Sequence, residues 1–275
     1  MEHQLTTEEL LALIDQGVAT FNEWRAEHPR ADIDLRGTDL GNRSLAGINL
    51  REAVLTQAVL RDADLTDANF DRASMEYVDL CGARLVGASF ANAHLVHAEM
   101  VAANLSGASL AGAALHMADL RHAHLVGANL QGAFLSGACL NLANVAHAQL
   151  DQAQLNHATL AHATLWGSSL AYVSLQGADL HQVNMTGATL LGVNLQDADL
   201  RDADLQEATL GHVNLRRADV RGASFAGASL EQVDFQLAHT EGADFAGADT
   251  DQDTRFEPPG IDEVDWGTGR PESSS

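Results

Sequence analysis

The sequence contains no lysine, so arginine supplies all 15 basic residues, which are outnumbered by 38 acidic residues for a net charge of −23. A chain this acidic has too few cations to neutralise nucleic-acid phosphates, which excludes direct binding of DNA or RNA through the phosphate backbone. The same charge is well suited to protein surfaces that normally bind nucleic acid.

Cysteines and long apolar runs are also scarce. The two cysteines, Cys81 and Cys139, provide no disulfide framework. No segment approaches the roughly 18 consecutive apolar residues that span a bilayer. The N-terminal "MEHQLTTEEL" lacks the basic and apolar regions of a signal peptide. We therefore expect a cytoplasmic protein without a membrane association.

Catalytic motifs are missing as well. The sequence has no Gly-rich phosphate loop, HExxH, CxxC or GxSxG, so we expect neither enzymatic activity nor a cofactor. Its 13 histidines are better explained as polar surface residues than as metal ligands. His122 and His162 occupy equivalent repeat positions, but about 10 Å apart if coils stack like strands. Zinc–nitrogen bonds are about 2.0–2.1 Å, so this pair does not predict a metal site.

Aromatic residues make up only 5% of the chain, although apolar residues reach 46%. A core with so few rings must be narrow and repetitive. From Leu35 to Phe245, 42 of the 43 positions divisible by five are Leu, Phe, Met or Val, and Thr240 is the exception. From Ala53 onward the residue two places earlier is nearly always Ala or Val, with Ser168 as the polar exception. This five-residue period fits neither a helix nor a strand.

The motif "A-[DN]-L-x-x", as in "ADLRD", "ANLSG" and "ADLQE", resembles the pentapeptide-repeat family over about four fifths of the chain. The resemblance implies an all-β solenoid, a right-handed quadrilateral parallel β-helix in which each pentapeptide forms one side of a square coil. Leucine and the preceding alanine then point inward. Residues 31–250 hold 44 pentapeptides, which gives about 11 coils and a rod roughly 53 Å long at about 4.8 Å per coil.

Residues 1–30 predict an α-helical cap on the first coil. Thr6 and Glu9 fit a capping box, and an apolar stripe extends from Leu10 to Trp24. Gly17 is placed to divide this segment into two short helices. The cap covers an end that otherwise exposes unpaired backbone and open core.

Residues 251–275 predict an acidic C-terminal tail that is partly disordered, because Pro, Gly and Ser are frequent there. Arg255 stands where the repeat calls for leucine. Phe256, Ile261 and Trp266 either cover the last coil or leave it open to a second subunit. We expect a homodimer joined through this end.

Acidic residues recur at one position of the repeat. Stacking the coils predicts one acidic column, interrupted at three positions. Aspartate suits a turn at this position, which is the simpler explanation; a negative stripe selected for binding is the alternative. The column contains Asp39, Asp79, Glu99, Asp119, Asp179, Asp199 and Asp219, and the interruptions are Val59, Cys139 and Thr159.

Charge is concentrated toward the two ends of the rod. Residues 101–178 carry two acidic residues and one basic residue, whereas residues 179–275 carry 19 acidic and six basic residues. Asp62, Asp64 and Asp67 form one acidic set, and Asp202, Asp204 and Glu207 form a second. The two sets lie seven coils apart, about 34 Å, which is close to the ~34–36 Å of one DNA turn. We take nine residues as a candidate partner-binding acidic edge: Asp62, Asp64, Asp67, Asp179, Asp199, Asp202, Asp204, Glu207 and Asp219.

The resemblance extends to family members that protect DNA gyrase from quinolones or natural toxins by occupying its DNA-binding saddle. It implies a non-enzymatic DNA mimic that binds DNA gyrase or topoisomerase IV. Those members typically dimerise through a C-terminal helix, and no amphipathic helix follows Phe245. Residues 31–250 carry 25 acidic and 11 basic residues, so their charge density is below that of duplex DNA. The alternative is a passive protein-interaction scaffold that uses the uncharged middle of the rod.

Overall fold

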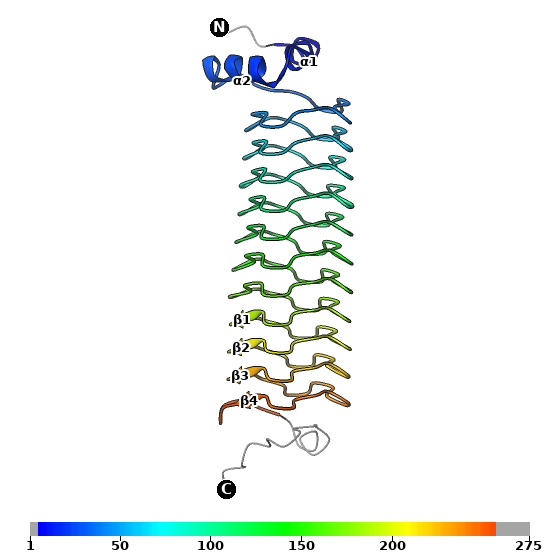
Figure 1. Cartoon of the computed structure of the whole chain (residues 1–275), viewed down its shortest axis with the longest axis vertical. Coiled ribbons are helices and arrows are strands. Elements are labelled where there is room, and N and C mark those ends of the chain that lie inside the picture. Colours follow the sequence, from blue (N-terminus) through cyan, green and yellow to red (C-terminus); the bar gives the residue numbers. More distant parts are fainter. Residues whose placement is uncertain (1–4, 257–275) are drawn as a thin grey trace.

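The computed structural model describes residues 5–256, and over this range the chain forms a rod of stacked coils with two helices at one end (Figure 1). Bridged residues are parallel and lie 20 apart, as in Asp39↔Val59 and Val59↔Asp79. Each coil therefore uses four pentapeptides, and each pentapeptide contributes one bridging residue. No helix in the described range is long and apolar enough to cross a membrane.

Regular strands occur toward the C-terminal end of the rod. They form one parallel sheet in the order β1-β2-β3-β4, with Thr189 opposite Thr209 and Ser229 opposite Asp249. The other coils pair through single bridges. The strands are β1 (Thr189–Leu191), β2 (Thr209–Gly211), β3 (Ser229–Glu231) and β4 (Asp249–Thr250).

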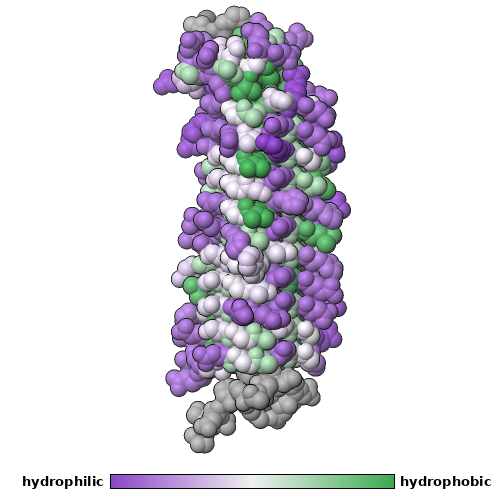
Figure 2. Space-filling model, viewed as in Figure 1, coloured by the Kyte–Doolittle hydropathy of each residue, from purple (hydrophilic) through white to green (hydrophobic). Residues whose placement is uncertain are grey.

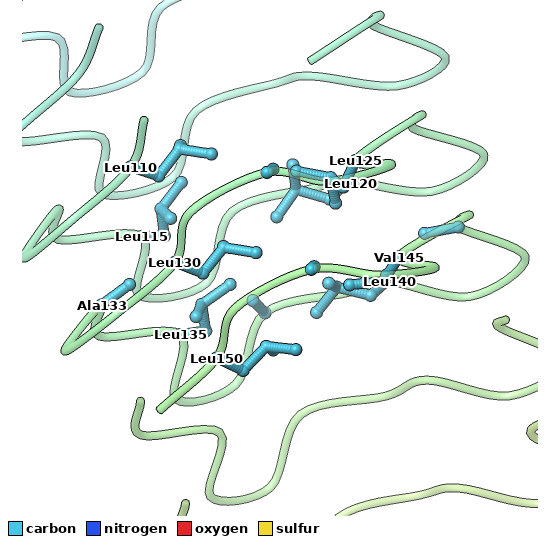
Figure 3. Close-up of a cluster of buried hydrophobic side chains, with 14 of the residues drawn as sticks. Leu110, Leu115, Leu120, Leu125, Leu130, Ala133, Leu135, Leu140, Val145 and Leu150 are labelled. Atoms are coloured by element: carbon cyan, nitrogen blue, oxygen red, sulfur yellow. The ribbon is translucent and has the colours of Figure 1, made fainter. Parts of the chain in front are cut away.

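The core consists of the leucine and alanine positions of the repeat. Leu130 and Ala133 are fully buried, and Leu110, Leu130 and Leu150 stack along the rod (Figure 3). The predicted inward positions of leucine and alanine are thus confirmed. The polar exception, Ser168, is also buried, and its hydroxyl donates a hydrogen bond to the Val145 carbonyl at 2.8 Å.

The turns between bridges require a left-handed residue. Gly107 and Gly127 have φ values of 66° and 65°, in the left-handed region that glycine adopts without steric cost. Asn, Asp and His are the other residues that enter this conformation most readily. Several histidines are therefore turn residues: His97, His122, His147, His157, His162 and His212.

Two helices, α1 (Thr7–Asp15) and α2 (Val18–Glu27), precede the first coil. The capping box is confirmed: the Glu9 N–H donates to Thr6 Oγ1, and the Thr6 N–H donates to Glu9 Oε2. Gly17, at φ 113°, separates the helices as predicted.

The helices pair with backbone groups that the first coil leaves open. Asn22 Nδ2 donates to the Gly47 carbonyl at 2.8 Å, and Asn22 Oδ1 accepts from the Asn49 N–H at 2.9 Å. The guanidinium of Arg25, which is 6% exposed, donates to the Arg51 carbonyl at 3.0 Å. These bonds tie the cap to the rod and satisfy donors and acceptors at its N-terminal end.

At the C-terminal end the repeat continues past residue 250 with one extra residue. Asp234 bridges Arg255, 21 rather than 20 residues on, so the predicted boundary at residue 250 falls within paired chain. Phe256 consequently stacks on Phe235, with ring centroids 4.7 Å apart and planes at 5°. Ile261, Trp266 and the rest of the predicted tail lie outside the described residues.

Candidate functional site

The acidic column exists as a ladder of bridges, with Asp179, Asp199 and Asp219 in successive coils. Its carboxylates stabilise the turns that follow them. The Arg201 N–H donates to Asp199 Oδ1 at 3.1 Å, and the Arg221 N–H donates to Asp219 Oδ1 at 3.2 Å. Such bonds are the reason aspartate suits this position. The same bond is made by Asp64, Asp179 and Asp204.

Basic side chains offset much of the charge in this column. The guanidinium of Arg201 lies 2.6 Å from Asp199, and that of Arg221 lies 2.6 Å from Asp219. Hydrogen bonds from these guanidiniums lower the pKa of both carboxyls, so the two pairs are ionised at neutral pH. The column is therefore less negative than its sequence suggests.

Acid should weaken the rod through such pairs. Hydrogen bonds from Arg217 lower the pKa of Asp197 to about 2, against about 3.9 in an unfolded chain. A lowered folded-state pKa stabilises the fold above the unfolded value, and this contribution is lost as pH falls through the folded value. We expect Asp197→Asn to lower the thermal midpoint at pH 7, and to lower it much less at pH 2, where most of the contribution of the ion pair has been lost. An equal decrement at both pH values, measured by circular dichroism, would contradict a role for this pair.

Five candidate residues lie outside such pairs: Asp204 at a bridge position, and four residues at turn positions. Asp62, Asp67, Asp202 and Glu207 occupy the left-handed turn position, with φ values of 56°, 55°, 56° and 57°. All four are exposed, and among residues 5–256 none has a basic partner within ion-pair distance. Their charges are thus available to a partner without first breaking an ion pair.

The carboxylates at these turn positions lie along the rod, over glycines of the next coil. A Cβ placed on Gly82 would lie 2.2 Å from Asp62 Oδ1, and one on Gly222 would lie 2.5 Å from Asp202 Oδ1. Glycine at the following coil therefore leaves room for each side chain. The same arrangement places Asp67 over Gly87.

The nine candidate residues form separate patches rather than one stripe. Asp64 and Asp204 share a bridged column, but Asn104, His124 and Asn144 lie between them. We define the N-terminal patch as Asp62, Asp64 and Asp67, and the C-terminal patch as Asp202, Asp204 and Glu207. The patches are seven coils apart, about 34 Å at strand spacing. Asp179, Asp199 and Asp219 lie in the neighbouring column.

Exposed apolar side chains are found mainly between the two patches. Tyr172 is 71% exposed, and Tyr77 is stacked on His97 with ring centroids 5.0 Å apart. On the face in Figure 2, hydrophilic side chains gather along both margins of a paler strip. The middle of the rod therefore offers an alternative, uncharged surface. Its other exposed apolar residues are Met117, Val126, Leu142, Trp166 and Leu191.

Two groups of ligand-type side chains were missed by sequence reasoning. The first contains Asp79, Cys81 and Glu99; the second contains Asp179, His181 and Asp199. In each group the potential ligand atoms lie within 4.8 Å of one another. No short motif marks these groups in the sequence. They could have been found from the 20-residue coil, because residues two and 20 places after an aspartate lie next to it in the structure.

Two of three comparisons with known proteins agree with this geometry. A family model described as "Pentapeptide repeats" matches in eight copies, and curated proteins gave no match. The solved structure of HetL, a pentapeptide repeat protein involved in heterocyst differentiation regulation in Nostoc, is 31% identical, with a TM-score of 0.51. The match covers 82% of this chain and 95% of HetL. The family model matches residues 33–72, 73–110, 103–141, 148–187, 184–222 and 214–249.

More distant structures were matched as well. QnrB1, a plasmid-mediated fluoroquinolone resistance protein, is 17% identical over 80% of this chain and 92% of its own, with a TM-score of 0.27. A pentapeptide repeat protein of the Arabidopsis thaliana thylakoid lumen is 23% identical over 45% of this chain and 72% of its own, with a TM-score of 0.34. Similarity at this level carries no argument about function.

Proposed function

The chain belongs to the pentapeptide-repeat family, and from that premise we propose that it is a non-enzymatic cytoplasmic DNA mimic. Its target would be DNA gyrase or topoisomerase IV, which it protects from poisons. The proposal takes the solenoid to be a four-sided rod of about eleven coils, the form that the repeat implies. Such a rod is long enough to present both acidic patches to one protein surface.

The observation that carries the proposal is the set of unpaired carboxylates. Asp62 and Asp67 at one end, and Asp202 and Glu207 at the other, are exposed and have no basic partner among residues 5–256. Their separation of about 34 Å is comparable to one turn of DNA. DNA-binding surfaces are rich in arginine and lysine and attract such charges over a Debye length of about 8 Å.

A supercoiling assay tests the proposal directly. The full chain should restore supercoiling by gyrase in the presence of a topoisomerase poison, and at higher concentration it should compete with DNA for the enzyme. A chain that neither binds gyrase or topoisomerase IV nor alters their poison sensitivity would reject the proposal.

A passive interaction scaffold is the second candidate, and the exposed apolar residues in the middle of the rod favour it. Trp166 is 48% exposed and Tyr172 is 71% exposed, in a segment with little charge. Exposed aromatic residues are enriched at protein interfaces. Replacing both with serine should leave gyrase protection unchanged if the acidic patches carry it, and should abolish partner binding if the middle carries it.

We also propose that two copies of the protein assemble through their C-terminal ends. Phe256 lies half-buried on Phe235 and Phe245, in the last coil that the structure describes. We expect a homodimer joined near residues 235–266, because the backbone pairing of a solenoid can continue from its end coil into a second copy. Light scattering on the intact chain and on a chain ending at Asp249 measures this. Monomers in both samples at tens of micromolar would contradict it.

A further inference from the structure

His162 and His181 lie together on the surface of the rod. Their ring centroids are 5.1 Å apart, and the ring planes stand at 75°. His162 is the second turn residue of one coil and His181 is the first turn residue of the next, 19 residues on. The 20-residue register aligns His162 with His122 and not with His181, so the repeat alone does not reveal this pair.

Two carboxylates complete the group around His181. Asp179 Oδ1 lies 2.6 Å from His181 Nδ1, and potential ligand atoms of Asp179, His181 and Asp199 lie within 4.8 Å of one another. Around a tetrahedral ion with bonds of about 2.0–2.1 Å, ligand atoms are about 3.3 Å apart. The side chains of His181 and Asp179 are 34% and 39% exposed, so they have room to rotate and close the difference.

We propose that Asp179, His181 and Asp199, with His162 as fourth ligand, bind one divalent transition-metal ion of the zinc, cobalt or nickel type. Imidazole nitrogen selects these ions, whereas magnesium and calcium take oxygen ligands. The set of two imidazoles and two carboxylates provides four ligands, the number that zinc requires in a tetrahedral site.

The charges around the group permit a cation. Arg201 donates to both oxygens of Asp199 and also lies 3.8 Å from Asp219, which pairs with Arg221. Arg201 makes four hydrogen bonds to the two oxygens of Asp199, one from its backbone N–H and three from its guanidinium, so a metal displaces the guanidinium from Asp199 toward Asp219. Three carboxylates against two guanidiniums leave the neighbourhood with one negative charge when the imidazoles are neutral.

The related group at the other end of the same columns is a poorer site. Burial raises the pKa of the Cys81 thiol, which opposes the thiolate that a metal needs. The metal is therefore assigned to the histidine group and not to the cysteine group.

A simpler role for His181 makes a different prediction. Arginine follows Asp119, Asp199 and Asp219 by two residues and pairs with each. His181 holds the same place after Asp179, so protonation alone gives it an ion pair. An ion pair between His181 and Asp179 does not involve His162. Titration with a metal therefore distinguishes the ion pair from a metal site.

The experiment uses the full chain without an affinity tag, stripped of metal by a chelator. At pH 7.5 it is titrated with Co²⁺, followed by visible d–d absorption, and with Zn²⁺, followed by calorimetry. We expect one ion per chain and absorption typical of a four-coordinate site. His181→Asn should weaken Zn²⁺ binding at least ~100-fold and His162→Asn at least ~10-fold, because loss of a ligand should cost no less than the roughly 10–100-fold caused by loss of an outer-shell partner.

A matched control comes from the same column. His122 has the same left-handed turn conformation as His162, with φ values of 59° and 57°, and asparagine is tolerated at both positions. His122→Asn should retain the parent's affinity. Failure of the parent to bind one ion per chain, or unchanged affinity in His181→Asn, overturns the proposal. Equal weakening in His122→Asn identifies diffuse surface chelation and overturns it as well.

Discussion

Replacing Leu130 with aspartate is expected to unfold the centre of the rod at room temperature. Leu130 is fully buried and stacks between Leu110 and Leu150. Truncation to alanine at such a site costs about 2–5 kcal/mol. An unpartnered carboxylate adds a desolvation penalty of several kcal/mol, which brings the total close to the ~5–15 kcal/mol that stabilises a typical domain.

Unfolding of the Leu130→Asp variant should begin in the coils around residue 130, because each coil of a solenoid contacts only its neighbours. Thermal unfolding by circular dichroism measures the loss of stability, and limited proteolysis near residue 130 locates it. Gln131→Asp is the matched control: this neighbouring side chain is exposed, so its substitution should change stability by no more than about 0.5 kcal/mol. If Leu130→Asp melts like the parent, the inward assignment of the leucines is wrong.

The core was predictable because a solenoid gives every repeat position one environment. Once Leu130 is assigned inward, every fifth residue follows, and the alanine two places earlier must share the narrow interior. Local signals also sufficed at the N-terminus, where Thr6 and Glu9 specify a helix start without help from the rest of the fold. These features depend on contacts close in sequence or repeated many times.

The features that sequence reasoning missed depend on side-chain direction or on a change of spacing. The step of 21 residues from Asp234 to Arg255 needs a wider turn. In it, the Thr254 N–H donates to Asp251 Oδ1 at 2.8 Å, and Thr254 Oγ1 donates to the Leu230 carbonyl at 3.1 Å. A fixed period of five places Arg255 in the core and gives no reason for the shift.

The sequence predicted where the acidic residues of the candidate site lie. It did not predict how many of their charges are paired with arginine. The register correctly placed Asp199 and Asp219 in one column, because bridges join residues 20 apart. Whether Arg201 turns toward Asp199 or away into solvent is a rotamer choice that the repeat does not determine. The turn residues Asp62 and Asp202, which have no basic partner among residues 5–256, consequently matter more to the proposed function than the column of Asp199 and Asp219.

Removing the charges of the C-terminal patch is expected to reduce gyrase protection about 10- to 100-fold. Each exposed ion pair with the target contributes up to about 1 kcal/mol, and 1.4 kcal/mol corresponds to a factor of ten. The variant is Asp202→Asn, Asp204→Asn and Glu207→Gln. The concentration giving half-maximal rescue of supercoiling measures the effect, and its dependence on salt should flatten because fewer charges are screened.

The variant should fold, because the rod already contains the new residues at equivalent positions. Gln152 and Gln182 adopt the left-handed conformation that Glu207 has, and Asn184 accepts the turn N–H of Thr186 at 3.0 Å as Asp204 accepts that of Gln206. Unchanged thermal stability therefore attributes any loss of protection to charge.

A control variant removes the same number of charges half a coil away. Asp71, Asp151 and Glu231 occupy the same repeat position in different coils. The change to Asn, Asn and Gln keeps the bond from the Ala171 N–H to residue 151 available. This control should protect gyrase nearly as well as the parent. Substituting His122, His147 and His162 in the neutral middle should also matter less. If all three variants weaken protection equally, only total charge matters; if the acidic variant protects like the parent, charge mimicry is wrong.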